Sequence, residues 1–220
     1  MNTIEKEINN LKRSLLSMFI LVEAQWEKGT SAIINYDQDI AEEISSSEAR
    51  INAQELKIDN ECENIIALHA PVAVDLRFIL STYKINHALE HIADIAQSIA
   101  KYVAESDVAY KKDIMDKTKI FEMLDTFNSM MDDLITAFEN EDPKIARKVF
   151  KKDKILNKIN SEAHEIIINS INSYDNSMML YLLSTIRKIE RAGDSLKKIG
   201  EEIIYHIEAK VIKHKKDRSK

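Results

Sequence analysis

The sequence predicts an all-α protein built as two tandem antiparallel three-helix bundles. Three glycines and two prolines among 220 residues are very few, and the turns of a β-sheet depend on residues of this kind. Apolar residues recur at steps of three and four over long stretches, which is the period of an amphipathic helix. Positions in the first half of the chain also return in the second half, which indicates a duplicated unit. Long helices joined by short loops pack as antiparallel bundles.

The first three-helix unit is predicted over residues 1–107. Its helices are expected at Thr3–Ile34, Gln38–Ala70 and Val72–Glu105. Asp37 is expected to cap the second helix, because its side chain can accept a hydrogen bond from a free amide of the first turn. Pro71 is expected to end that helix, since proline disfavours helix in the residue before it and lacks an amide donor.

The second three-helix unit is predicted over residues 113–212. Its helices are expected at Ile114–Asn140, Pro143–Asn172 and Tyr174–Val211. Asp142 and Pro143 fit an N-cap followed by proline in the first helical position, and Ser173 is expected to cap the last helix. Residues 213–220 form a basic tail, which is interpreted as a solvated helix end, with contact to anionic lipid or to an acidic partner as the alternative.

Two offsets relate the two units. An offset of 105 residues aligns Ala32, Asp37, Ile40 and Ala41 with Ala137, Asp142, Ile145 and Ala146. An offset of 100 residues aligns Asp75, Glu90, Asp94 and Ile99 with Asp175, Glu190, Asp194 and Ile199. The change of offset falls at the loop before the third helix of each unit, where insertions are tolerated.

Pairs of acidic residues four positions apart are the candidate functional residues. Glu90 and Asp94 share one face of the third predicted helix, and Glu55 and Asp59 share one face of the second. If these helices pack side by side, four carboxylates gather, and crowded carboxylates repel unless they are protonated or bridged by a cation. Oxygen-rich clusters suit Mg²⁺, Mn²⁺ and iron. The alternative is a solvated charged stripe with partners such as Lys84 or His91.

The second unit repeats only part of this pattern. Glu190 and Asp194 correspond to Glu90 and Asp94, but Asn160 and His164 stand at the positions of Glu55 and Asp59. His164 remains a possible nitrogen ligand. With fewer negative charges, a weaker or different metal site is expected there.

Several functional classes are excluded or disfavoured. None of the histidines follows a glutamate by three residues, as a ferritin-type di-iron site requires. No HExxH motif, glycine-rich phosphate loop or nucleophile elbow is present, so the chain is predicted not to be an enzyme. The net charge of −6 argues against nucleic-acid binding. The longest apolar run is too short for a transmembrane helix, and a cytoplasmic, soluble protein is expected.

The stretch around the first acidic pair resembles the signature of the PhoU family, bacterial regulators of phosphate uptake. The family pattern is approximately Pro-Val-Ala-x-Asp-Leu-Arg, followed by Leu-Glu-Arg-Ile-Gly-Asp. The chain matches the first part with PVAVDLR at residues 71–77 and the second part with LEHIAD at 89–94 and IERAGD at 189–194. His91 and Ala93 depart from the arginine and glycine of the pattern.

The resemblance implies a cytoplasmic protein, often a homodimer, that restrains the phosphate-starvation response when phosphate is plentiful. It implies a non-catalytic adaptor between the ATPase subunit of a phosphate ABC transporter and a sensor histidine kinase, with a peripheral position at the inner face of the membrane through these partners. Some family members bind multinuclear iron or zinc clusters. The implied metal ligands here are Glu55, Asp59, Glu90, Asp94, Glu190 and Asp194, with Glu48, Asp153 and His164 as possible peripheral ligands.

Three alternative functions remain open from the sequence. The chain is an accessory subunit of another phosphate permease, a metalloprotein that uses a carboxylate cluster for chemistry, or a purely structural helical dimer. The residues do not determine which metal would bind, and manganese and magnesium are possible as well as iron and zinc. Some of the alternative functions need no metal.

Overall fold

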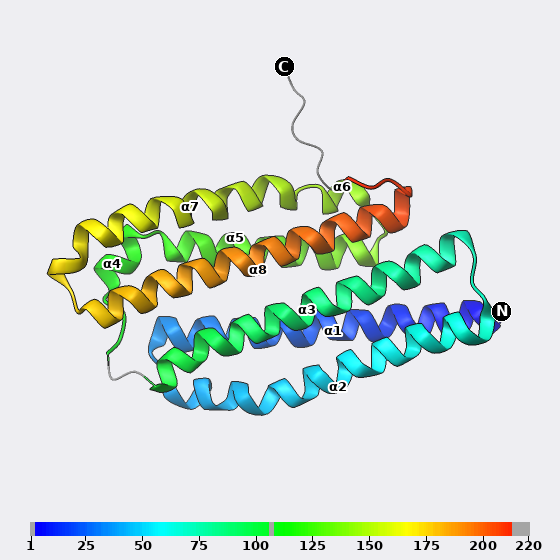
Figure 1. Cartoon of the computed structure of the whole chain (residues 1–220), viewed down its shortest axis with the longest axis horizontal. Helices are drawn as coiled ribbons and strands as arrows, with labels where there is room; N and C mark the ends of the chain where they lie inside the picture. The colour runs from blue at the N-terminus through cyan, green and yellow to red at the C-terminus, as the bar shows by residue number, and fades with distance from the viewer. Residues whose placement is uncertain (1–2, 106–107, 213–220) are drawn as a thin grey trace, which may run out of the picture.

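The computed structural model describes residues 3–105 and 108–212, and every described element is helical, as the sequence predicts. The first unit contains α1 (Thr3–Asn35), α2 (Gln38–His69) and α3 (Ala73–Glu105). The second contains three long helices, α5 (Ile120–Glu139), α7 (Val149–Ser170) and α8 (Asn176–Glu208), with short α4 (Lys112–Lys117), α6 (Pro143–Ala146) and the 3-10 turn η1 (Ile171–Ser173). The two units lie against each other along their length, with α3 beside α8 (Figure 1). The predicted basic tail, residues 213–220, lies outside the described residues.

The duplication is visible in the turn that follows the first long helix of each unit. Tyr36 and Glu141 occupy the same left-handed conformation, with φ of 53° and 52°. The next residues, Asp37 and Asp142, each donate their amide at 3.0 Å to a carbonyl five positions earlier. Their side chains cap the following helix at 3.0 and 2.8 Å, as predicted. The two units therefore share backbone geometry at the positions that the offset of 105 aligns.

The second unit is more broken than the sequence indicates. The helix predicted from residue 114 to residue 140 is divided by Lys119, whose φ is 57°. The preceding Thr118 is the C-cap of α4, and its hydroxyl donates a hydrogen bond to the carbonyl of Ile114 at 2.9 Å. The next predicted helix is divided after Ala146, where the amide of Lys148 bonds to a carbonyl only three residues back, at 2.9 Å. Helix breaks are usually predicted from glycine or proline. The first of these two breaks occurs at a lysine in the left-handed conformation, so the sequence does not indicate it.

The ends of the last helix also differ from the prediction. Asp175, not Ser173, is the N-cap of α8, and its carboxylate accepts the amide hydrogen of Met178 at 2.8 Å. The helix ends at Glu208 rather than Val211, because Ala209 has a φ of 56°. The third helix likewise begins at Ala73, slightly later than predicted.

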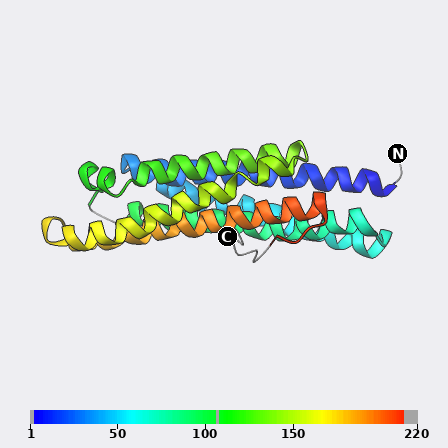
Figure 2. The same ribbon diagram turned by 90° about the horizontal axis from the view of Figure 1, so that it is seen from above.

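Aromatic rings join the two units into one core. Trp26 of α1 stacks on Phe127 of α5 with ring centroids 3.8 Å apart, and both rings are buried. Phe19 and Phe138 form a second contact between these helices at 5.9 Å. Figure 2, turned by 90°, shows the helices of both units running along one common long axis. Over the described residues, no helix is long and apolar enough to span a membrane.

Candidate metal centre

Helices α2 and α3 bring two of the predicted ligands together around a histidine. Nδ1 of His87 lies 2.9 Å from Oε1 of Glu55, and its Nε2 lies 3.4 Å from Oδ2 of Asp59. One ligand atom from each of the three residues lies within 4.8 Å of the other two. Glu55 and Asp59 are half-buried, and His87 is exposed at the rim. The predicted side-by-side packing of these two helices is therefore present.

Asn86 fixes the two helices beside this group. Its side chain is fully buried, and its amide nitrogen donates to Oδ1 of Asp59 at 2.9 Å and to the carbonyl of Glu55 at 3.0 Å. Its own Oδ1 has no hydrogen-bond partner among the described residues. A buried amide oxygen without a partner is uncommon in folded proteins. Asn86 thus holds Asp59 in place and leaves one buried oxygen available beside the cluster.

The second predicted pair continues the same face of α3. Glu90 lies one turn beyond His87, and Asp94 lies one turn beyond Glu90. Burial, followed by the charges of Asp94 and Glu55, raises the pKa of Glu90 to about 7. The crowded carboxylates therefore favour a bound proton or another cation.

Glu48 and Gln97 extend the acidic face by one further turn. The amide of Gln97, three residues beyond Asp94, donates a hydrogen bond to the Glu48 carboxylate. Over the described residues, no lysine or arginine forms an ion pair with the carboxylates of this face (Glu48, Glu55, Asp59, Glu90 and Asp94). Lys84, a partner considered from the sequence, instead pairs with Glu202 at 3.2 Å. Among the described residues, His87 is the basic side chain that contacts carboxylates of this face, at Glu55 and Asp59.

The donor set of the first unit fits a metal ion. Carboxylate oxygens and one imidazole nitrogen suit Zn²⁺, Mn²⁺ and iron, whereas Mg²⁺ prefers oxygen ligands alone. His87 is the residue that the sequence-based candidates omitted. Its signal was its place one helical turn before Glu90, on the face that carries both acidic residues of α3.

The second unit brings three of its candidates together around a lysine. Nζ of Lys197 lies 2.8 Å from Oδ2 of Asp153 and 4.0 Å from Oδ1 of Asp194. Asp153 is only 3% exposed. Burial, followed by the charges of Asp194 and Asp153, raises the pKa of Glu190, so all three acidic residues interact.

The remaining candidates of the second unit stand apart from this group. His164 is exposed and Asn160 is half-buried. In the described part of the chain, neither side chain forms a hydrogen bond or ion pair with Glu190 or Asp194. The two units therefore place corresponding acidic residues alike but surround them differently.

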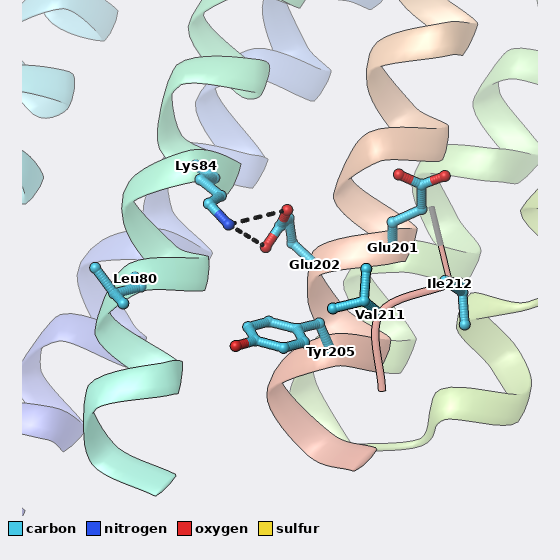
Figure 3. A pocket seen from close by; sticks show the side chains of 7 residues that line it. All are labelled: Leu80, Lys84, Glu201, Glu202, Tyr205, Val211 and Ile212. Atoms are coloured by element: carbon cyan, nitrogen blue, oxygen red, sulfur yellow. Dashed lines mark hydrogen bonds and ion pairs between the residues drawn. The ribbon is translucent and has the colours of Figure 1, made fainter. Parts of the chain in front are cut away.

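A separate pocket lies between α3, α8 and the segment that follows α8. It has a volume of about 220 Å³. Its lining is Leu80, Lys84, Glu201, Glu202, Tyr205, Val211 and Ile212. Figure 3 shows the Lys84 ammonium directed at the Glu202 carboxylate across the wall of this pocket, with Tyr205 below them. Because this cation and this carboxylate satisfy each other, the pocket is not a second cation site.

A duplicated three-helix fold with an acidic face on each unit defines the class as a helical-bundle binding protein. The chain belongs to the PhoU family: the family model described as "PhoU domain" matches residues 15–103 and 120–203, one interval in each predicted repeat.

Comparisons with individual proteins agree with the family assignment. The chain is 28% identical over 214 residues to the phosphate-specific transport system accessory protein PhoU of Edwardsiella tarda, covering 94% of this chain and 86% of that protein. The crystal structure of PhoU from Pseudomonas aeruginosa has a TM-score of 0.85 at 25% identity and covers 94% of this chain and 100% of that one. PhoU from Streptococcus pneumoniae has a TM-score of 0.86 at 24% identity, with 96% and 99% covered. The Edwardsiella protein is named an accessory protein and the Streptococcus protein a regulatory protein, in agreement with the prediction that the chain is not an enzyme.

Proposed function

We propose that this chain is an accessory protein of a phosphate transport system that restrains phosphate uptake and the phosphate-starvation response. The match of both repeats to the PhoU family carries this proposal, together with relatives named as accessory proteins of phosphate-specific transport. The chain acts as an adaptor between the ATPase subunit of a phosphate ABC transporter and a sensor histidine kinase. It works in the cytoplasm, as a homodimer, and reaches the inner face of the membrane through these partners.

The acidic face of the first unit is the proposed cation-dependent part of the adaptor. Glu55, Asp59 and His87 would hold a metal ion, and Glu90 and Asp94 would hold further metal of a multinuclear iron, zinc or manganese cluster. The ion would neutralise carboxylates that have no lysine or arginine partner in the described structure. It would also fix α2 against α3 on the surface offered to a partner.

The adaptor regulates by binding one state of the transporter–kinase complex more tightly than the other. A binding protein shifts an equilibrium only by its difference in affinity for the two states. Stronger binding to the state formed at high phosphate would hold the kinase inactive and limit transport.

Affinity purification from cells grown at high and at low phosphate tests this proposal. A tagged wild-type chain is expected to recover the transporter ATPase and the sensor kinase, with greater recovery at high phosphate. The matched variants are Glu90→Ala with Asp94→Ala, and Glu190→Ala with Asp194→Ala, and we expect the first to reduce recovery more. Recovery of neither partner by a folded wild-type chain contradicts the adaptor role. Recovery of a different phosphate permease instead favours the alternative accessory role.

A further inference from the structure

The acidic residues of the second unit, Asp153, Glu190 and Asp194, form the second acidic face. This face already contains a cation, the ammonium of Lys197. Asp153 is 3% exposed, and Nζ of Lys197 lies 2.8 Å from its Oδ2, within normal hydrogen-bond length. The same nitrogen lies 4.0 Å from Oδ1 of Asp194. A buried carboxylate is costly unless a partner of opposite charge and a hydrogen bond compensate it, and Lys197 supplies both.

The corresponding pair in the first unit is Glu48 with Gln97, and the side chain of Gln97 is uncharged. Glu48 aligns with Asp153 at the offset of 105, and Gln97 aligns with Lys197 at the offset of 100. The structure confirms this alignment, because Gln97 bonds to Glu48 just as Lys197 bonds to Asp153. At equivalent places the first unit therefore has an amide and the second an ammonium.

The acidic residues and the histidine of the first-unit group are also replaced at the corresponding positions of the second unit. Asn160 and His164 replace Glu55 and Asp59, and the exposed Arg187 stands at the position of His87. Within the described ranges, the group of three close metal-ligand side chains lies in the first unit and not around Asp153. The residues of the second face do not fit a metal ion while Lys197 lies between them.

We propose that Lys197 is the tethered cation of the second unit, taking the place that a metal ion would need, so that this acidic face is closed to metal. This inference shares one assumption with the proposed function, namely that the first face binds a divalent metal ion. A substitution that removes the ammonium of Lys197 but keeps a hydrogen-bond donor for Asp153 should allow the second face to bind a metal ion. The carboxylates of Asp153 and Asp194 then lose the ammonium that lies 2.8 and 4.0 Å from their oxygens.

The test uses the full-length chain carrying Glu55→Ala, Asp59→Ala, Glu90→Ala and Asp94→Ala, so that the first face has lost its four proposed carboxylate ligands. Lys197→Gln is added to this background, because glutamine is the residue of the first unit. The added probe is Mn²⁺ or Zn²⁺ alone, measured by metal content and by the shift of the melting temperature. We expect Lys197→Gln to retain metal and to melt higher in its presence, with an apparent affinity at least about tenfold above that of the background, the size expected for one site-determining residue.

Two substitutions control for charge and position. Lys197→Arg keeps a cation at the site, and Lys198→Gln removes an exposed charge next to it; neither is expected to increase metal binding. Asp153→Glu with Lys197→Gln restores the complete Glu–Gln pair of the first unit, and it replaces Lys197→Gln as the measured variant if the single substitution loses helical signal.

The proposal is overturned if the folded glutamine variants bind no more metal than the background, or if the background with Lys197 intact binds metal at the second face. Metal-free wild-type protein is a different outcome. It contradicts the cation-dependent part of the proposed function, whereas the Lys197 experiment, performed without the first face, still decides this inference.

Discussion

Glu48 faces the neutral amide of Gln97 in the first unit, whereas its counterpart Asp153 faces the ammonium of Lys197 in the second. Glu48, Glu90 and Asp94 have acidic counterparts in Asp153, Glu190 and Asp194, and the turn after the first long helix has the same geometry in both units. Their charge balance differs, because among the described residues the carboxylates of the first face form an ion-pair contact with His87 but with no lysine or arginine. A duplicated fold can thus keep acidic residues at equivalent positions while their partners differ in charge.

The largest expected difference concerns stability. Lys197→Ala removes the cationic partner of the buried Asp153 carboxylate, which keeps a 3.4 Å hydrogen bond from Asn157. This is expected to cost about 3 kcal/mol, the lower end for breaking a buried ion pair, since Lys197 is partly exposed. In a chain of this length that loss lowers the melting temperature by about 6–12 °C. Gln97→Ala removes a neutral donor and is expected to cost only about 1 kcal/mol. Thermal unfolding followed by circular dichroism compares the two, and equal losses would remove the distinction between the pairs.

Metal affinity should depend on one unit only. His87→Ala removes the nitrogen ligand between Glu55 and Asp59 and is expected to weaken Zn²⁺ or Mn²⁺ binding by at least about tenfold. Arg187→Ala, the change at the corresponding exposed position of the second unit, should leave the affinity unchanged. Isothermal titration of both variants measures this, and unchanged binding by His87→Ala would show that the imidazole is not a ligand.

The helix caps should behave alike in the two units, because the backbone there is the same. Asp37→Ala and Asp142→Ala each remove a side-chain acceptor from the first turn of a helix, and each is expected to cost about 1 kcal/mol. The corresponding loss in melting temperature is about 2–4 °C. Chemical denaturation of the two variants provides the check. A large difference between them would mean that the duplication is less exact than these turns indicate.

The smallest expected effect is a gain in stability that depends on pH. Burial and the neighbouring carboxylates raise the pKa of Glu90 to about 7, above its ordinary value of 4.5. The folded chain therefore binds this proton more tightly than the unfolded chain, and the stabilisation is present below pH 4.5 and lost as the pH rises through 7. Glu90→Gln removes the charge and should raise the melting temperature of metal-free protein at pH 8, by no more than about 2–4 °C.

The matched variant for that experiment is Glu190→Gln. The pKa of Glu190 is also raised by burial, Asp194 and Asp153, but Arg191 and Lys197 oppose the shift. Its gain at pH 8 should therefore be smaller than that of Glu90→Gln. Melting curves at pH 4 and pH 8 in the presence of a chelator measure both, and neither variant should gain stability at pH 4. A larger gain for Glu190→Gln would contradict the charge balance described above.

The sequence was sufficient for the parts of the molecule that follow a fixed period. The spacing of Glu90 and Asp94 placed both on one face of α3, and the internal repeat located the caps Asp37 and Asp142. The helix breaks at Lys119 and after Ala146 were missed, because they occur without glycine and depend on tertiary packing. Pairs of residues on different helices, such as Lys197 with Asp153, depend on how far one helix slides along its neighbour. Spacing within a helix does not determine that register.

Metal content of three purified chains tests the central difference between the units most directly. The chains are wild type, Glu90→Ala with Asp94→Ala, and Glu190→Ala with Asp194→Ala, each prepared with the same supply of iron, zinc and manganese and measured by mass spectrometry. Wild type and the second-unit variant should retain the same metal content, while the first-unit variant should retain less, with its helical signal unchanged, because it keeps only Glu55, Asp59 and His87 of the proposed ligands. Equal metal in wild type and the first-unit variant, or a loss confined to the second-unit variant, would contradict the assignment of the metal to the first unit.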